Sequence, residues 1–195
     1  MKTINLICIR HGQSEANIDI DLYYTKPDHK IELTAVGSGQ AIQLYNELEK
    51  LYPSSNKNKI ICSPWTRAKQ TAQKLKELSS FPVIEDPLIH EMLVMNSFDE
   101  MNTNKDFNCT KRIDFSQYWH KTGSSESYID AYNRARTLLQ DLILNRYDLN
   151  DGDNLFIISH GIFLSMFEIA IDKKPIDEER HLGNCKYFTR TLDII

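Results

Sequence analysis

Four short apolar runs along the chain alternate with segments in which apolar residues recur at helical spacing. The runs cover residues 4–9, 59–62, 82–84 and 154–158. Short runs this rich in apolar residues are typical of strands that are buried on both faces of a sheet. Residues 187–194 alternate between apolar and polar side chains and predict a fifth strand, at the edge of the sheet.

The helical segments fall between the predicted strands. Thr34 is a candidate N-cap for a first helix, and Ser63 leads into a second helix in which Pro64 takes the favoured first position. A long helix is predicted from Glu126, and a mostly apolar one over residues 161–171. Strands that alternate with helices predict an α/β fold, here a three-layer α/β/α sandwich around a mostly parallel sheet.

Residues 88–125 show no sustained periodicity. A stretch this long without elements of its own is uncommon unless it is functional, so we expect a lid inserted into a single domain that covers residues 1–195. The aromatic side chains of this stretch either fill the core of the lid or line a substrate pocket; they are Phe98, Phe107, Phe115, Tyr118 and Trp119.

The composition and charge of the chain argue against several classes of protein. The 195 residues carry a net charge of −4, with a pI of about 5.9, whereas nucleic-acid-binding proteins usually present a basic surface. No stretch approaches the roughly 18 apolar residues of a membrane span, and the first apolar run is too short for a signal peptide. The four cysteines lack a CxxC spacing, so we expect reduced, buried thiols in a cytoplasmic protein.

Three of the predicted strands end directly in polar motifs. Arg10-His11-Gly12 follows the first strand, residues 63–67 follow the second, and Ser159-His160-Gly161 follows the fourth. Ligands of open α/β sheets bind in the crevice outside the carboxyl ends of the strands. Because parallel strands place those ends on one side of the sheet, two histidines and two arginines are expected to converge there.

These residue types suit a phosphoryl group. Arginine pairs bidentately with phosphate oxygens, and two arginines can bind a dianion. A neutral imidazole can act as a nucleophile. A glycine after each histidine lets the backbone approach a ligand closely, and the helix that starts at Gly161 would point its N-terminus into the crevice.

At these motifs the sequence resembles branch 1 of the histidine phosphatase (phosphoglycerate mutase-like) superfamily. The four ordered motifs that carry the resemblance are Ile9-Arg10-His11-Gly12-Gln13-Ser14-Glu15-Ala16-Asn17, then Leu33-Thr34 with Gly37 and Gln40-Ala41, then Ser63-Pro64-Trp65-Thr66-Arg67-Ala68-Lys69-Gln70-Thr71-Ala72, and finally Ser159-His160-Gly161. The main departure is Gln13, where glutamate is more usual, and we do not expect it to abolish activity.

The resemblance implies a role for each site residue. His11 would be the catalytic nucleophile that becomes phosphohistidine. Arg10, Arg67 and His160 would hold the phosphoryl oxygens, with Asn17 adding a hydrogen bond, and His160 is also counted as catalytic. Gly161, at the start of its helix, is counted with the phosphate-binding residues. Arginines and a histidine would do what magnesium does in other phosphoryl transfers, so neither a metal nor another cofactor is implied.

The resemblance also implies a carboxylic acid that protonates the leaving oxygen, and Glu91 occupies its place after the third strand. Such a carboxyl group stays protonated near neutral pH only through burial or a nearby anion such as the bound phosphate. Asp86 and Asp99 are the next candidates for this role. His90 adjoins Glu91 and could lie near the pocket, while Lys26 and its neighbours either meet a second anionic group or form a solvated loop.

Three functions remain open at this point. The first is a metal-independent phosphomonoesterase that acts on a small phosphorylated metabolite. The second is a phosphoglycerate mutase-type phosphotransferase, although family mutases follow the acid with Tyr-Gly, and here Glu91 precedes Met92. The third is a non-catalytic phosphate-binding module. The expected partner is a small phosphorylated substrate, with no nucleic acid and no membrane, and the oligomeric state stays open, a homodimer included.

Overall fold

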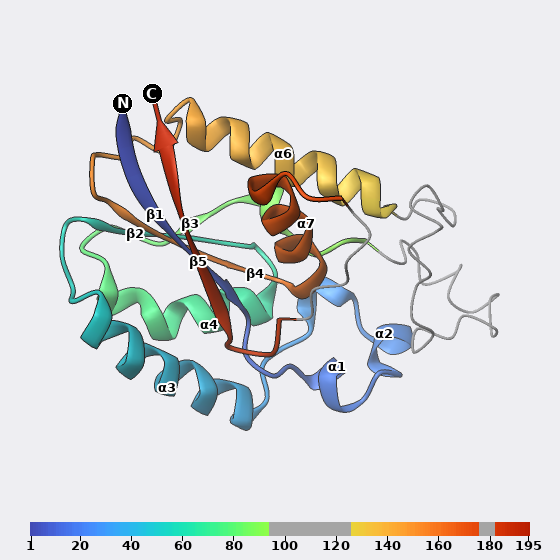
Figure 1. The fold of residues 1–195 in the computed structure, drawn as a ribbon. Helices are drawn as coiled ribbons and strands as arrows, with labels where there is room; N and C mark the ends of the chain where they lie inside the picture. Colours follow the sequence, from blue (N-terminus) through green and yellow to red (C-terminus); the bar gives the residue numbers. More distant parts are fainter. Residues whose placement is uncertain (94–125, 176–181) are drawn as a thin grey trace.

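The computed structural model of the chain describes residues 1–93, 126–175 and 182–195. Five strands form one sheet in the order β3-β2-β4-β1-β5, in which β5 runs antiparallel to β1 and every other neighbouring pair is parallel (Figure 1). The strands are β1 (Lys2–Arg10), β2 (Asn58–Cys62), β3 (Ile84–Glu85), β4 (Asn154–Ser159) and β5 (Tyr187–Ile194). The predicted edge position of the last strand is therefore observed.

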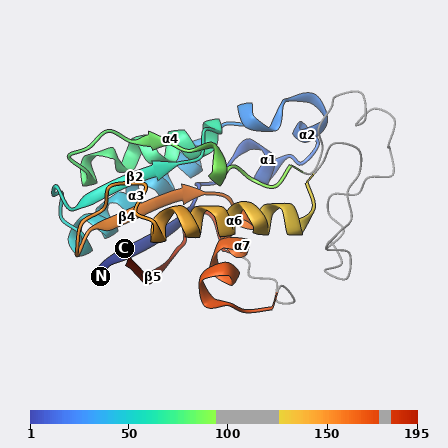
Figure 2. The ribbon, with the colours of Figure 1, turned by 90° about the horizontal axis from the view of Figure 1, so that it is seen from above.

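Helices cover both faces of the sheet, as Figure 2 shows from above. The α-helices are α1 (Glu15–Ile18), α2 (Leu22–Thr25), α3 (Ala35–Leu51), α4 (Thr66–Leu75), α6 (Tyr128–Ile143) and α7 (Gly161–Asp172), and the short 3-10 helices are η1 (Asp28–Lys30), η2 (Lys76–Leu78) and η3 (Pro87–Ile89). The predicted α/β class with helices on two sides of a mostly parallel sheet is confirmed. Most of the expected lid, at residues 94–125, lies outside the described residues.

Alternate side chains of each strand enter two separate cores. On β1, Leu6 and Cys8 pack with residues of α6 and α7, whereas Ile7 and Ile9 pack with residues of α3 and α4. All four side chains are fully buried. Because successive side chains of a strand point to opposite faces, an unbroken apolar run is what a strand between two helical layers requires.

Two of the predicted boundaries are wrong. Helix α4 begins at Thr66, with Trp65 as its N-cap, so Pro64 lies ahead of the helix and not at its first position. The reason is that the backbone N–H of Ser63 still donates to the carbonyl of Ile158 in β4, at 2.9 Å, which keeps the chain extended at the strand end. The third strand occupies Ile84–Glu85, slightly later than the predicted 82–84.

Three asparagines form a ladder across the amino ends of three neighbouring strands. Asn154 of β4 accepts from Asn5 of β1 at 2.9 Å and donates to Asn58 of β2 at 2.8 Å. The three residues are also paired in the strand register. The Asn58 amide, in turn, contacts three carbonyls: those of Tyr52 and Pro53 after α3, and that of Leu78 at the end of η2. Asn58 is fully buried and requires such partners, so the ladder couples the strand register to the segments that follow α3 and α4.

The cysteines of the described residues behave as small buried side chains. Cys8, Cys62 and Cys185 are free thiols, and burial raises the pKa of Cys62 to about 12 and that of Cys185 to about 11. Cys109 lies outside the described residues. Within residues 1–93, 126–175 and 182–195, no helix combines the length and apolarity needed to cross a bilayer.

Candidate active site

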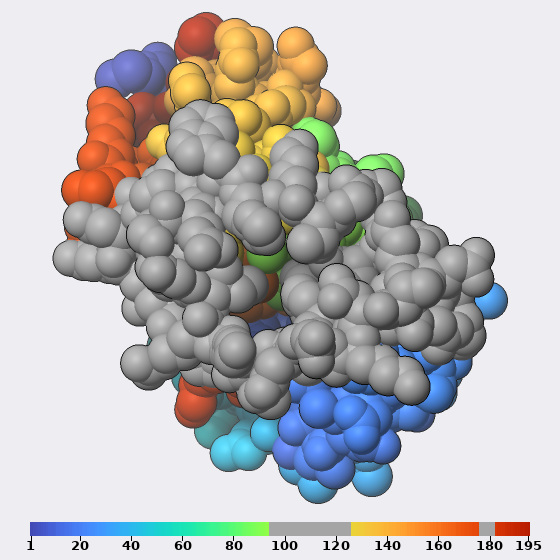
Figure 3. Space-filling view, turned by 90° about the vertical axis from the view of Figure 1, so that its right-hand side faces the viewer, coloured from blue at the N-terminus to red at the C-terminus, as the bar shows by residue number. Residues whose placement is uncertain are grey.

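The carboxyl ends of three adjacent strands bring the predicted site residues together. Arg10 at the end of β1 is in register with Ser159 at the end of β4, and Cys62 at the end of β2 is in register with Ile158. The polar motif that follows each of these strands therefore lies at the same edge of the sheet. Figure 3 looks onto this edge, with the helical α1–α2 segment in blue on one side of it and the start of α6 in yellow on the other.

His11 is held in one tautomer at the end of β1. Its side chain is 3% exposed, and Nδ1 lies 2.7 Å from the carbonyl oxygen of Gly12. A carbonyl only accepts hydrogen bonds, so Nδ1 carries the proton. Nε2 accepts from the Nε–H of Arg67 at 3.2 Å. Burial, and then the charge of Arg67, lower the pKa of His11 well below its usual value, so Nε2 holds a lone pair at neutral pH.

Arg67 is fixed by contacts on three sides. It donates through one terminal nitrogen to both the backbone carbonyl and the carboxylate of Asp28, each at 2.8 Å. Its guanidinium also stacks over the ring of Trp65, 4.7 Å from the ring centroid. Among the described residues, the second terminal nitrogen has no hydrogen-bond partner, which leaves it free to meet a ligand. Asp28 was not predicted, because its loop shows no motif that distinguishes it from solvated charges.

Two buried nitrogens at the site, Arg10 Nε and His160 Nδ1, lack hydrogen-bond partners within the described residues. One other nitrogen of each side chain has a partner: Arg10 Nη1 donates to the carbonyl of Leu182 at 2.6 Å, and His160 Nε2 lies 2.8 Å from Ser63 Oγ. The His11 and His160 rings meet edge to face, with centroids 5.1 Å apart. Buried polar atoms without partners are costly, so this arrangement favours a ligand with oxygen acceptors.

Burial also changes the charge states around this space. The pKa of Arg10 is lowered by burial, an effect that Glu91 partly offsets. The pKa of His160 is lowered well below its usual value by burial and then by Arg67. Two guanidinium groups and two neutral imidazoles thus share the site, a combination that suits a dianion without adding a third positive charge.

Glu91 lies on the loop that follows η3, against the first turn of α7. Its Oε1 accepts from the backbone N–H groups of Met92 at 2.9 Å and Phe163 at 3.0 Å, and its Oε2 accepts from that of Ile162 at 3.2 Å. The first-turn amides of α7 therefore serve Glu91, which corrects the expectation that they would face the ligand directly. Gly161 itself lies against Arg10: a Cβ on Gly161 would sit 3.5 Å from Arg10 Nε.

The two alternatives to Glu91 have different outcomes. Asp86 is committed elsewhere, because its carboxylate caps η3 through the N–H of Leu88 at 2.8 Å and makes a short hydrogen bond with the hydroxyl of Tyr147. Asp99 lies outside the described residues. Among the described carboxylates proposed for proton donation, Glu91 is the one whose charge acts on Arg10.

The hydrogen bonds of the Asn17 side chain hold the segment after His11 in place. Its Oδ1 accepts from the N–H of Ser14 at 2.9 Å, which closes the start of α1, and from the amide of Asn184 at 3.1 Å. The same Asn184 amide lies 3.2 Å from the carbonyl of His11. Asn184 was missed by sequence reasoning, since it precedes the last strand and belongs to none of the four motifs.

The motif that contains Thr34, Gly37 and Gln40 packs against the turn that carries His11. A Cβ on Gly12 would lie 2.6 Å from the carbonyl oxygen of Gly37, so Gly12 serves close packing against α3 and not ligand approach. The Gln13 side chain accepts from the hydroxyl of Thr34 at 2.9 Å, and the backbone N–H of Gln13 donates to the side-chain oxygen of Gln40 at 2.8 Å. The unusual Gln13 is thus engaged with the start of α3.

Aromatic contacts place His90 at the site, as its position next to Glu91 suggested. Its ring stacks on Trp65 with centroids 5.9 Å apart at 14°, and Trp65 meets His160 edge to face at 4.9 Å. Trp65 stood within the quoted motif but carried no predicted role. Lys26 forms an ion pair with Glu15 at 2.5 Å, so its charge is already compensated.

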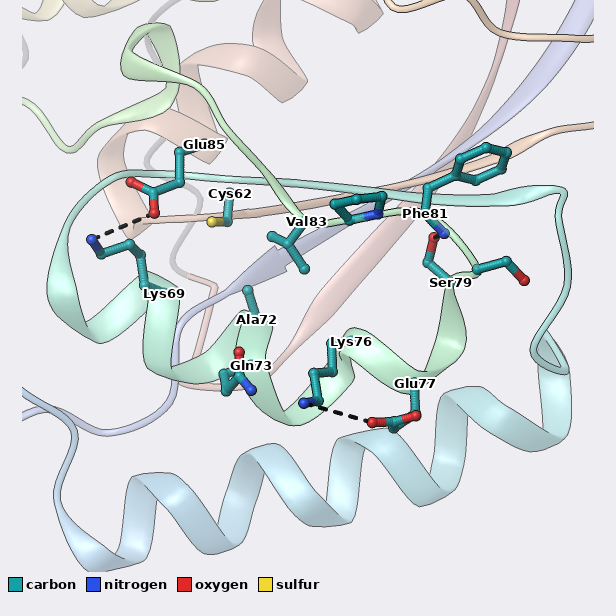
Figure 4. A pocket seen from close by; sticks show the side chains of 12 residues that line it. Cys62, Lys69, Ala72, Gln73, Lys76, Glu77, Ser79, Phe81, Val83 and Glu85 are labelled. Atoms are coloured by element: carbon teal, nitrogen blue, oxygen red, sulfur yellow. Dashed lines mark hydrogen bonds and ion pairs between the residues drawn. The ribbon is translucent and has the colours of Figure 1, made fainter.

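A cavity of about 580 Å³ lies beside α4, away from the histidines (Figure 4). Its lining includes Lys69, Gln73, Phe81 and Glu85, and none of the predicted site residues. Across the part of the chain that the structure describes, no group of three or more His, Cys, Asp or Glu side chains could hold a metal ion.

Comparison with known proteins gives consistent matches. The family model of the histidine phosphatase superfamily, branch 1, matches residues 6–191. Phosphoglycerate mutase-like protein AT74 of Arabidopsis thaliana is 29% identical over 196 residues; the match covers 92% of this chain and 61% of the plant protein. This chain therefore spans about three fifths of the length of that relative.

Two solved structures share the fold. A mycobacterial glucosyl-3-phosphoglycerate phosphatase matches with a TM-score of 0.75 at 20% identity, over 97% of this chain and 91% of that one. A variant of phosphoserine phosphatase from Entamoeba histolytica matches with a TM-score of 0.70 at 23% identity, over 95% and 89%. At these identities the likeness shows the architecture alone.

Proposed function

This chain belongs to branch 1 of the histidine phosphatase superfamily, and on that premise we propose that it is a phosphomonoesterase that works through a phosphohistidine intermediate. The proposed substrate is a small phosphorylated metabolite, held through its phosphoryl group at the carboxyl ends of the strands. No metal or other cofactor takes part in the proposed reaction.

In the first step the lone pair of His11 Nε2 attacks phosphorus, and the bond from phosphorus to the ester oxygen breaks. Glu91 gives a proton to the leaving oxygen, which departs as an alcohol. The Nδ1–H of His11 stays on the carbonyl of Gly12 and keeps the ring oriented.

Arg67 changes partner during this step. Its Nε–H donates to His11 Nε2 in the free protein, but that lone pair becomes the bond to phosphorus. The freed N–H then finds a phosphoryl oxygen, so its hydrogen bond to charge strengthens as the reaction proceeds. Interactions that form in the transition state and not before are the ones that accelerate a reaction.

In the second step water attacks phosphorus and gives its proton to the Glu91 carboxylate. The bond from phosphorus to Nε2 breaks, its electron pair returns to His11, and inorganic phosphate leaves. One group thus serves as acid and then as base, which restores the starting state of the protein.

The observation that carries the proposal is that hydrogen-bond donors without partners lie near a neutral nucleophile. Arg10 Nε and His160 Nδ1 are buried and without partners among the described residues, and the His160 ring meets the His11 ring with centroids 5.1 Å apart. A scaffold that only binds phosphate has no need for an imidazole in its neutral form beside two guanidinium groups. The non-catalytic alternative is therefore less favoured.

A phosphatase is also favoured over a mutase. The residue after Glu91 is Met92, whose side chain is 3% exposed and belongs to the apolar core under α7, so it offers no polar contact to a sugar acid. The Lys111–Arg112 pair, which could bind a substrate carboxylate, lies outside the described residues.

The test is turnover of an aryl phosphate by the purified protein, with His11→Ala as the matched variant. Steady release of phosphate by the natural protein, and a loss of several powers of ten in the variant, is the expected result. Turnover in His11→Ala within about tenfold of the natural protein would exclude a covalent His11. A panel of phosphorylated metabolites, including phosphoglycerates with a search for positional isomers, then separates phosphatase from mutase.

A further inference from the structure

Ser63 and His160 make a fully buried contact behind the proposed phosphoryl site. Ser63 Oγ lies 2.8 Å from His160 Nε2, and both residues have no exposed surface. The backbone of Ser63 is tied to β4 through Ile158. The position of the hydroxyl is therefore set by the sheet and not by the ligand.

The proton of the Ser63 hydroxyl determines the direction of this hydrogen bond. Ser63 Oγ already accepts from the backbone N–H of Trp65 at 3.3 Å. A buried hydroxyl also needs an acceptor for its own proton. Within the described residues His160 Nε2 is the one acceptor that contacts Ser63 Oγ, so Ser63 donates and Nε2 holds the lone pair. The proton of the neutral His160 ring is then on Nδ1.

We propose that Ser63 is a positioning residue that locks His160 in its Nδ1–H tautomer, so that a buried N–H donor faces the phosphoryl group. This inference rests on the proposed function for its purpose, although the tautomer itself can be measured without any substrate. His160 Nδ1 is the ring atom that has no partner among the described residues. In the opposite tautomer, Nδ1 would present a lone pair to an anion and repel it.

The contact thus converts a neutral ring into an oriented donor without a third positive charge at the site. His160 is kept neutral by burial and by Arg67, and a neutral imidazole donates through one nitrogen alone. The nitrogen that carries the proton is determined by the hydrogen bond that the other ring nitrogen makes, as in oriented histidines generally. Ser63 supplies this choice from outside the ligand space.

Three variants test the proposal. Ser63→Ala removes the hydroxyl, Ser63→Thr keeps a donor at the same place, and Ser159→Ala removes a neighbouring buried hydroxyl that donates to the carbonyl of Ile89 and not to a histidine. Long-range proton–nitrogen correlation spectra of the ligand-free proteins, labelled with ¹⁵N, report which nitrogen of His160 is protonated. Hydrolysis of an aryl phosphate is measured in parallel.

In the natural protein, Ser63→Thr and Ser159→Ala we expect the spectrum of an Nδ1–H ring. In Ser63→Ala the preference should be lost, and kcat/KM should fall about 10- to 100-fold, as for other residues that orient a catalytic ring. Ser63→Thr should recover most of that loss. An Nε2–H ring in the natural protein, or an unchanged Nδ1–H ring in Ser63→Ala, would overturn the proposal.

These outcomes separate the inference from the proposed function. If the natural protein turned over no phosphate ester but showed the Nδ1–H ring that Ser63→Ala loses, the function would fail and the positioning role of Ser63 would stand. If turnover were normal and the His160 ring carried its proton on Nε2, the proposed function would stand and the positioning role of Ser63 would fail. Should Ser63→Ala fold poorly, Ser63→Thr and the natural spectrum still decide the tautomer.

Discussion

The Nε–H of Arg67 donates to His11 Nε2 at 3.2 Å, with both side chains almost fully buried. A guanidinium at this distance disfavours a second proton on the imidazole, and burial disfavours it further. The pKa of His11 is lowered by both effects. The same pair therefore links the chemistry of the site to the stability of the fold.

Acid should destabilise the folded protein through His11 and His160. The pKa of each is lowered on folding, so below about pH 6.5 the unfolded chain binds protons that the folded chain does not. We expect the free energy of unfolding to fall as pH decreases from about 7 to about 5, by up to about 1.4 kcal/mol per pH unit for each histidine. Urea unfolding across this range measures the slope, and His11→Gln should reduce it; an unchanged slope in that variant would contradict the assignment.

Glu91→Gln should slow hydrolysis most for poor leaving groups. General acid catalysis contributes roughly 10²- to 10⁴-fold, and an alkyl alcohol needs it far more than a nitrophenolate does. Steady-state kinetics on an alkyl phosphate and a nitrophenyl phosphate give the comparison. Arg67→Ala is the control, because both substrates present the same dianion and should lose activity alike. Equal losses for the two substrates in Glu91→Gln would remove Glu91 from the acid role.

Arg134 should affect activity without contacting the substrate. It donates to the carbonyls of Leu88 at 2.6 Å and His90 at 3.0 Å and pairs with both oxygens of Glu126, at 2.8 and 2.7 Å, so it holds the loop that carries Glu91. We expect Arg134→Gln to lower the free energy of unfolding by about 2–3 kcal/mol, because it leaves a partly buried carboxylate unpaired.

The activity of Arg134→Gln toward an alkyl phosphate should drop about tenfold, since a small misplacement of an acid is costly. Arg136→Gln is the matched control on the same helix: Arg136 is exposed, and its loss should change stability by less than about 0.5 kcal/mol. Urea unfolding and initial rates of both variants provide the check. Similar stability and activity of the two arginine variants would argue against the role of Arg134 in holding the Glu91 loop.

The asparagine ladder should contribute to stability and not to catalysis. Asn154→Ala leaves Asn5 without an acceptor and the buried Asn58 without a donor, and we expect a loss of about 2–3 kcal/mol. Asn46→Ala, at an exposed position of α3, should cost less than about 0.5 kcal/mol. Rates for the folded Asn154→Ala protein should match those of the natural protein, because the ladder lies at the amino ends of the strands.

Chelation should leave turnover unchanged. The proposed reaction neutralises the phosphoryl charge with Arg10, Arg67 and His160, so no step depends on a divalent cation. Rates before and after treatment with EDTA and gel filtration measure this. A loss of activity that magnesium or zinc restores would show that the site is incomplete as described.

Sequence patterns alone predicted the α/β class and most of the strands and helices that build it. The apolar runs at residues 4–9 and 154–158 pointed to strands buried on both faces, and both became central strands of the sheet. Local periodicity carries this information because the alternation of buried positions depends on near neighbours. The polar motifs after the runs at residues 4–9, 59–62 and 154–158 likewise predicted that His11, Arg67 and His160 would meet.

Only the tertiary structure revealed the groups that set the state of those residues. Asp28 against Arg67, Ser63 behind His160, Asn184 beside His11 and Arg134 over the Glu91 loop are contacts between segments far apart in sequence or in loops without a pattern. Such contacts depend on strand register and on the path of loops, which no local period encodes. Local sequence patterns predicted which chemical groups gather at the strand ends, whereas the long-range contacts of the folded chain set the surroundings of those groups and the direction in which each one points.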